Sequence, residues 1–232
     1  MSIVEPKKYF TGVLINDSSL SFDPIEILIH FGVTLGTNFP LLRGVYKTLR
    51  KLDLQFVHKP LIGAEIVVLF DYEQQSVTIK RESEVTLTLP QFLQFLGKVD
   101  VAFAPILPLG TTVELDETML PLGVERMFTE GVGARVTLTG RKVPLQSGFD
   151  HYLVDYYGRL WPFGEMPGGE PIIISNMMIK RVIQEGYKDE WEERFSFDVL
   201  RATQVARQQI STAFMTTEDA LRFYETLEKG KD

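Results

Sequence analysis

The first hundred residues alternate between helical and strand spacing of their apolar side chains. Apolar residues three and four positions apart predict amphipathic helices, and runs in which every second residue is apolar predict half-buried strands. The predicted helices cover residues 25–32, 41–52 and 90–97. The predicted strands cover residues 64–71, 76–80 and 85–89, the first two as a hairpin. Asp23 and Pro24 are typical of a helix cap and first turn, so the first helix is expected to start there.

After Asp100, prolines and turn residues become frequent, which predicts a domain boundary near residue 100. Alternating apolar residues predict four strands, over residues 111–115, 134–140, 151–160 and 171–174. The pair Ser175–Asn176 is expected to cap a short helix. That helix would carry the apolar residues Ile179, Val182 and Ile183.

Two further helices are expected to close the chain, one capped by Ser196 and one by Thr216 or Thr217. The inward residues of the first would be Leu200, Val205, Ala206, Ile210 and Phe214, and the second would carry Leu221, Tyr224 and Leu227. Because the strand–helix–strand order of a parallel sheet is missing, we predict an α+β fold with mostly antiparallel sheets and flanking helices. It would comprise two small units plus C-terminal helices, over residues 1–100, 101–196 and 197–232.

Composition and charge narrow the function classes. With 44% hydrophobic and 24% charged residues, the 232-residue chain has an ordinary globular composition. It has no cysteine, which excludes disulfides, zinc–thiolate sites, iron–sulfur clusters and a cysteine nucleophile. The net charge is −7, so nucleic-acid binding is not expected. We see no apolar stretch of membrane length and no secretory signal, and therefore expect a cytoplasmic protein without membrane insertion.

Candidate cofactor and metal motifs are incomplete. The segment 131–134 begins like a dinucleotide motif but lacks the later glycine, and segment 164–169 lacks the lysine and hydroxyl of a phosphate loop. His30 lies in an apolar helix and is expected to be a core or half-buried side chain. A strand would bring only His151 and Asp155 to one face, whereas a catalytic zinc needs three ligands. We therefore predict no catalytic, cofactor-binding or metal site.

Acidic side chains gather in one segment, at Glu185, Asp189, Glu190, Glu192 and Glu193. Lys188 and Arg194 stand among them at helical spacing. This pattern favours a solvated helix surface over an acid–base pair.

An aromatic group around residue 157 permits two interpretations. On a regular strand, Tyr152 and Tyr156 share one face, and Tyr157, Trp161 and Phe163 share the other. One such face belongs in a core, whereas two require either a buried strand or an exposed patch. Tyrosine and tryptophan are enriched at protein interfaces, so core packing and a partner surface both remain open.

Five segments of the second half follow one another in an order typical of one family. They are Leu107–Leu115, Val136–Arg141, Asp155–Gly164, Ile172–Asn176 and Ile179–Glu190. Over about residues 104–195 they resemble a small firmicute domain of unknown function that accompanies type VII secretion loci encoding LXG toxins. The resemblance implies no catalytic motif. It implies an accessory role beside a secreted toxin.

Four residues in this region are more apolar than the resemblance leads us to expect. They are Trp161, Phe163, Met177 and Met178. Large exposed apolar side chains are rare without a partner to cover them, so these four are the predicted partner-binding residues. Residues 116–133 are expected to be an insertion.

We consider three functions. The first is a chaperone or targeting factor that binds a type VII secreted toxin or its small helical secretion partner. The alternative is an immunity protein that neutralises a toxin encoded nearby. The third is an enzyme in the N-terminal half, which is disfavoured because neither a carboxylate pair nor a nucleophile–base spacing is present. We therefore expect a protein-binding protein that is not an enzyme.

The incomplete ligand motifs generate a first prediction. Zinc, magnesium, ATP and NAD should each leave the melting temperature of the purified protein unchanged. A specific ligand at a hundred times its dissociation constant would add about 2.7 kcal/mol to the unfolding free energy. A reproducible stabilisation at micromolar ligand would contradict the prediction.

Overall fold

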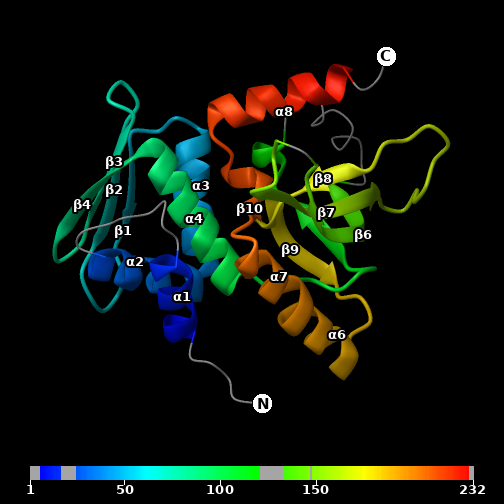
Figure 1. The fold of residues 1–232 in the computed structure, drawn as a ribbon, viewed down its shortest axis with the longest axis horizontal. Coiled ribbons are helices and arrows are strands. Elements are labelled where there is room, and N and C mark those ends of the chain that lie inside the picture. Colours follow the sequence, from blue (N-terminus) through cyan, green and yellow to red (C-terminus); the bar gives the residue numbers. More distant parts are fainter. Residues whose placement is uncertain (1–5, 17–24, 121–132, 147, 230–232) are drawn as a thin grey trace. The chain divides into compact units, whose positions relative to one another are not determined.

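The computed structural model describes residues 6–16, 25–120, 133–146 and 148–229 (Figure 1). The chain divides into unit 1, Met1–Ala104 with Phe214–Glu218, and unit 2, Pro105–Ala213 with Asp219–Asp232. Helices combined with antiparallel sheets confirm the α+β prediction. The predicted cap at 23–24 and most of the predicted insertion lie outside the described residues.

The described residues of unit 1 form a four-stranded antiparallel sheet and four helices. The strands follow one another in chain order across the sheet: β1 (Gln55–His58), β2 (Ile66–Asp71), β3 (Ser76–Lys80) and β4 (Glu84–Thr88). The helices are α1 (Pro6–Ile15), α2 (Ile25–Thr37), α3 (Phe39–Arg50) and α4 (Leu89–Phe103). Of the described helices, none taken alone is long and apolar enough to cross a membrane; α2 and α3 reach that length and composition only together, across a bend of 107°.

Helix α4 organises the core of unit 1. Thr88 caps it by accepting from the backbone N–H of Gln91, whose side chain bonds back to Thr88. The ring of Phe95 stacks on Phe31 at a centroid distance of 5.8 Å and meets Phe10 edge-on at 6.3 Å. The helix thus joins α1 and α2 to the buried face of the sheet.

Two glycines were expected to end helices and instead lie inside them. Helix α2 continues past Gly32 to Thr37, and α4 continues past Gly97 to Phe103. A Cβ at Gly32 would lie 2.3 Å from the Phe10 ring, so the missing side chain makes room for close helix packing. Both predicted helix ends were wrong, and at Gly32 the reason is that the glycine serves tertiary contact and not termination.

Unit 2 is built on a six-stranded sheet in the order β10-β7-β6-β5-β9, with β8 also paired to β7. The strands are β5 (Thr112–Leu115), β6 (Arg135–Pro144), β7 (Tyr152–Leu160), β8 (Ile172–Ile174), β9 (Ile179–Gln184) and β10 (Ile210–Ser211). All pairs are antiparallel except the short pair of β10 with β7. This confirms the prediction of a mostly antiparallel sheet, and its core side carries Val113, Val136, Leu138, Tyr156 and Ile174.

The helix predicted after Asn176 is wrong. A single 3₁₀ turn, η2 (Asn176–Met178), leads directly into strand β9. Six residues of β9 lie opposite four of β5, with Lys180 and Ile183 as the extra residues of two bulges. The bulges disturb the alternation of a regular strand, so the apolar spacing of three and four resembles that of a helix.

The helix predicted to start at Ser196 begins earlier. Asp189 caps α6 (Glu190–Arg194), which continues through the π-helical η3 (Phe195–Arg201) into α7 (Ala202–Ala206). Of the predicted inward residues, Ala206 is exposed, whereas Ile210 and Phe214 are buried in β10 and in the 3₁₀ turn η4 (Thr212–Phe214). A third 3₁₀ turn, η1 (Glu117–Met119), follows β5.

The last helix, α8 (Thr217–Lys229), is present but turns a different face inward. Leu221 and Tyr224 are exposed. Phe223 instead packs edge-on against Phe149 at 5.5 Å, and Asp219 accepts a hydrogen bond of 2.7 Å from the Tyr152 hydroxyl. The contacts of this helix with unit 2 are therefore partly polar.

The close packing at Gly32 generates a prediction for the stability of unit 1. Gly32→Ala should lower the unfolding free energy by about 1–3 kcal/mol, because its methyl group must displace the Phe10 ring. Gly12→Ala is the matched control, since no atom lies within 4 Å of a Cβ there. It should raise the free energy by up to about 1 kcal/mol through helix propensity. Urea titration of both variants measures the two effects, and equal effects would contradict the packing argument.

Candidate protein-binding surface

The motif residues of unit 2 mostly bind one another. The hydroxyl of Tyr156 accepts from the N–H of Leu107 at 3.0 Å and donates to the carbonyl of Pro105 at 3.1 Å. Arg141 donates to the carbonyl of Leu107 at 3.3 Å. Two separate motifs of the chain, those of Tyr156 and Arg141, thus fix the segment before β5.

Gly186 holds the same loop from the other side. Its N–H donates to the Thr111 hydroxyl at 3.0 Å, and that hydroxyl donates to the carbonyl of Pro108 at 2.7 Å. A Cβ at Gly186 would lie 2.1 Å from the carbonyl oxygen of Leu109. Only glycine allows this approach, so the loop after β9 packs directly on backbone.

Asp155 lies at the centre of a buried polar cluster. Its carboxylate pairs with the Lys142 ammonium at 2.7 Å and accepts from the N–H of Asn176 at 3.1 Å and the hydroxyl of Ser211 at 2.6 Å. Both side chains of the ion pair are almost fully buried, whereas His151 is exposed. Asp155 is therefore engaged in joining strands. In the described part of the chain, no group of three or more histidine and acidic side chains could hold a metal ion.

Glu192 corrects the expectation that the whole acidic segment is a solvated surface. The guanidinium of Arg141 binds both of its carboxylate oxygens, the longer contact being 2.8 Å, and Ser196 donates to it at 2.9 Å. These two charged side chains are largely shielded from solvent. The hydrogen bonds from Arg141 lower the pKa of Glu192, although partial burial opposes them. The pair anchors α6 to strand β6.

Residues 161–170, between β7 and β8, form an exposed arm that extends from the sheet of unit 2 (Figure 1). Arg159 braces it by donating to the carbonyl of Gly169 at 2.7 Å and to Glu165 at 2.6 Å. Phe163 is 62% exposed and Trp161 41%, with the Arg135 guanidinium 5.5 Å from the Trp161 ring. The arm therefore presents two aromatic side chains on a braced backbone.

Burial separates the four predicted partner-binding residues. Trp161 and Phe163 lie at the surface of the arm. Met177 is only 1% exposed, and Met178 packs against the core cluster of unit 2. The two methionines therefore contribute to the core of unit 2, and only the two aromatic residues are available to a partner.

A second set of exposed apolar side chains lies before and along α6 and η3. Tyr187, Trp191, Phe195 and Val199 are spaced by four residues, and we call them the helix stripe; Tyr187 lies just before α6, and Phe195 and Val199 lie in η3. Trp191 is 77% exposed and Tyr187 82%, and between residues 190 and 206 only Gln204 is buried. The four-residue spacing can be read from the sequence. The acidic residues between these positions, however, favoured the interpretation of the segment as a solvated helix surface. The exposure itself depends on how Arg141 and Glu192 orient the helix.

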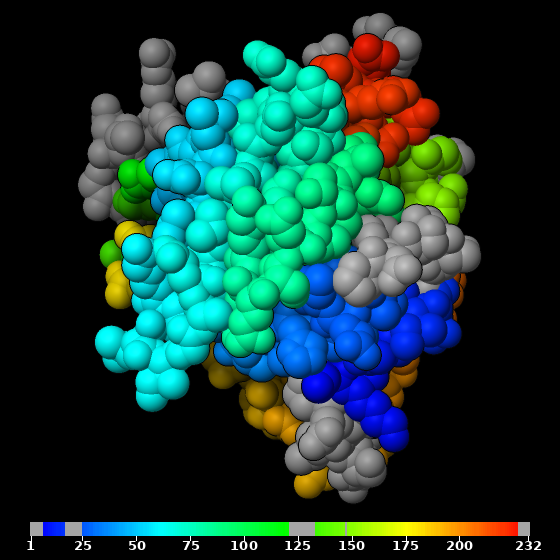
Figure 2. Space-filling view, turned by 90° about the vertical axis from the view of Figure 1, so that its left-hand side faces the viewer, coloured from blue at the N-terminus to red at the C-terminus, as the bar shows by residue number. Residues whose placement is uncertain are grey.

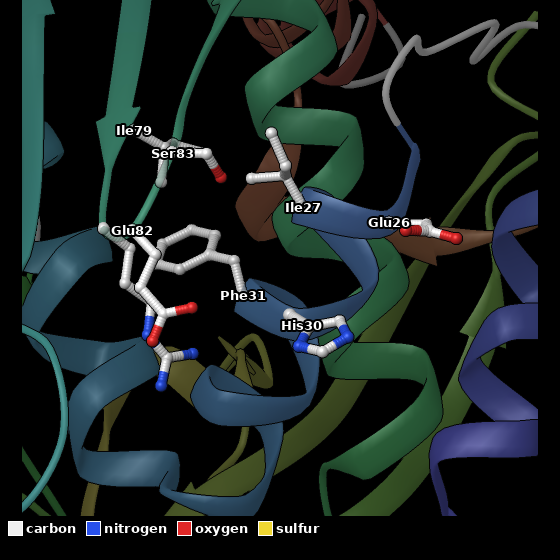
Figure 3. A pocket seen from close by; sticks show the side chains of 8 residues that line it. Glu26, Ile27, His30, Phe31, Ile79, Glu82 and Ser83 are labelled. Carbon is white, nitrogen blue, oxygen red and sulfur yellow. The ribbon is translucent and has the colours of Figure 1, made fainter.

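Unit 1 contains a cavity of about 290 Å³ between α2 and the turn that joins β3 to β4 (Figure 3). His30 lines it and is exposed, which corrects the expectation of a core or half-buried histidine. Glu26 is turned away from Glu82 in Figure 3, and Arg81 donates to the hydroxyl of Thr34 at 3.1 Å. The cavity thus does not bring its acidic side chains together.

Comparison with known proteins yields one match. A family model described as a domain of unknown function (DUF4176) matches residues 106–195. No curated protein and no solved structure matches the chain. The match confirms that this region resembles a domain of unknown function, and it includes the arm and most of the helix stripe.

The shielded ion pair of Glu192 generates a prediction on pH. Because the folded state lowers its pKa, the pair stabilises the protein above the ordinary glutamate value of about 4.3, and this contribution is lost as the pH falls through the folded pKa. Glu192→Gln should cost about 1–3 kcal/mol at neutral pH and much less in acid. Urea titrations of both proteins across this range measure the difference. A pH-independent cost would contradict the assignment.

Proposed function

We propose that this chain is a cytoplasmic accessory protein that binds another protein through exposed aromatic residues of unit 2. The helix stripe carries the proposal. Exposed Trp and Tyr side chains are frequent hot spots, because they bury a large area on binding and lose little side-chain entropy. Leaving Trp191 and Tyr187 in water favours a partner that covers them.

The contacts that hold helix α6 in one position favour tight binding. Asp189 caps α6, and the pair of Arg141 and Glu192 ties the helix to strand β6. A helix held in one position loses little freedom when a partner binds, so more of the contact energy contributes to affinity.

Charge around the stripe indicates the chemistry of the partner. Glu185 and Glu190 are exposed along the same segment, whereas Glu193 pairs with Lys188 at 3.4 Å and the Arg194 guanidinium lies 6.0 Å from the Trp191 ring centroid. The rim of the stripe therefore carries charges of both signs. The partner should present an apolar face bordered by charges that complement them.

We identify the partner through the family resemblance. It would be a type VII secreted LXG toxin or its small helical secretion partner, and the chain would act as a chaperone or targeting factor before export. An immunity protein is the alternative, and it differs in which end of the toxin it binds. A chaperone or targeting factor engages the N-terminal targeting region, whereas an immunity protein engages and silences the toxic C-terminal domain.

The test is a binding titration with the two parts of a toxin encoded beside this chain. The N-terminal region should bind, and Trp191→Ala should raise the dissociation constant about 30-fold, which corresponds to the hot-spot scale of about 2 kcal/mol. Trp161→Ala should have a similar effect if the arm belongs to the same surface. Tyr224→Ala is the control, because Tyr224 is equally aromatic and exposed but lies on α8.

Thermal melts accompany each titration. All three variants should melt close to the unchanged protein, since each residue lies at the surface and outside the buried core. A loss of about 3–5 kcal/mol in folding stability would assign a residue to the core instead. Binding of the C-terminal domain alone would favour the immunity protein. Failure to bind either part, with partners also missing after affinity purification from the native host, would overturn the proposal.

A further inference from the structure

Strand β4 forms one edge of the sheet in unit 1, and its hydrogen-bonding pattern can be assigned. The N–H of Leu89 donates to Gln75 at 2.7 Å, and the N–H of Arg81 donates to Ser83 at 2.9 Å. In an antiparallel pair, bonded and non-bonded residue pairs alternate. Thr86 therefore belongs to a non-bonded pair, and its N–H and C=O point away from β3.

The same alternation exposes a row of backbone groups along β4. Glu84 and Thr88 share the outward orientation of Thr86. The N–H of Thr88 bonds to the side chain of Gln91, and its carbonyl, at the N-cap of α4, accepts the first hydrogen bond of that helix. On the outer face of the sheet, the Thr86 hydroxyl lies 2.9 Å from that of Thr78. The edge thus offers outward donors and acceptors at Glu84 and Thr86, as an added antiparallel strand requires.

Among the residues that the structure describes, this edge carries none of the usual side-chain or bulge protection against pairing. Natural edge strands carry lysine, proline or bulges that block the addition of another strand. Strand β9 in unit 2 has two bulges as well as Lys180 and Arg181. Strand β4 has a regular register, only one charged residue, and exposed threonines of high strand propensity. Figure 2 looks from the side on which β4 lies in Figure 1 and shows this part of the chain, coloured between cyan and green, at the surface.

We propose that β4 pairs antiparallel with β4 of a second copy of this chain, about a two-fold axis at Thr86. The outward N–H and C=O groups of the two Thr86 residues then bond to each other. The N–H of each Glu84 lies beside the carbonyl of Thr88 on the other copy, whose second lone pair it shares with the first bond of α4. Val85 and Leu87 of opposite copies become neighbours and extend the buried face. The two sheets join into one of eight strands.

Charge supports this symmetric register. Each Glu84 faces a threonine and not the other Glu84. That threonine, Thr88, is the N-cap of α4, whose first turn contains no acidic residue. Each Glu84 also pairs with Lys80 of its own β3 at 3.2 Å, so the register brings no unpaired like charges together at the axis.

Cross-linking tests the register directly. The chain has no cysteine, so Thr86→Cys introduces a single thiol. In a bonded antiparallel pair the two Cα atoms are about 5.5 Å apart, within the range of a disulfide. Mild oxidation should give a cross-linked dimer. Val57→Cys is the matched control and should stay monomeric on the same gel, because Val57 is exposed and directed outward on β1 at the opposite edge.

The oligomeric state tests the same surface without a cross-linking reaction. Sedimentation of the full chain should give twice the chain mass, and Thr86→Lys should raise the dissociation constant at least about tenfold by placing two like charges at the axis. Thr86→Val and Val57→Lys should leave the dimer intact, and melting curves show whether each variant is folded. A monomer at every concentration, a dimer unaffected by Thr86→Lys, or equal cross-linking at residues 57 and 86 would overturn the proposal. The proposal would also be overturned if a different protein, and not a second copy of this chain, were found paired with β4.

Discussion

The carboxylate of Asp155 is the group on which the arrangement of unit 2 depends. It is buried, and an isolated buried charge is very costly. Its partners come from three other parts of the unit: Lys142 on β6, the N–H of Asn176 in η2, and Ser211 on β10. Because the charge must be satisfied, all three have to reach their positions together. A buried pair of this kind gives weak evidence for stability, and its attested use is to specify one arrangement.

The motif residues around this cluster mainly hold the backbone of unit 2 in place. Tyr156, Thr111 and Gly186 hold the loop before β5 through hydrogen bonds and close backbone packing. The exposed aromatic residues lie on two segments that arginines hold in place. Arg159 bonds to the backbone of the arm, and Arg141 binds Glu192 of α6. The unit therefore separates residues that fix geometry from residues that meet solvent.

The sheet edges of the two units differ in a related way. Strand β9 is bulged and carries Lys180 and Arg181, which disfavours pairing with another strand. Strand β4 is regular and presents backbone groups at its edge. The exposed aromatic side chains belong to unit 2 and the regular edge to unit 1.

The sequence determined most strands, because alternation of apolar residues states directly which face of a strand is buried. Strands β5 to β8 lie where the alternation predicts them, and with them comes the antiparallel sheet. The sequence also identified Trp161 and Phe163, both exposed, as unusually apolar. These are local properties, readable from neighbouring residues.

The tertiary structure decided where helices end, whether the segment 179–184 is a strand, and which individual side chains are buried. Gly32 marks a close contact with Phe10, which no local pattern distinguishes from a helix end. The segment 179–184 is a strand because β5 pairs with it, although its apolar spacing is also that of a helix. Met177 is buried while Trp161 is exposed, and Glu192 is shielded among exposed acids because Arg141 reaches it from β6. Each outcome depends on residues distant in the chain, whose approach is set by packing and by the cost of burying unpaired charge.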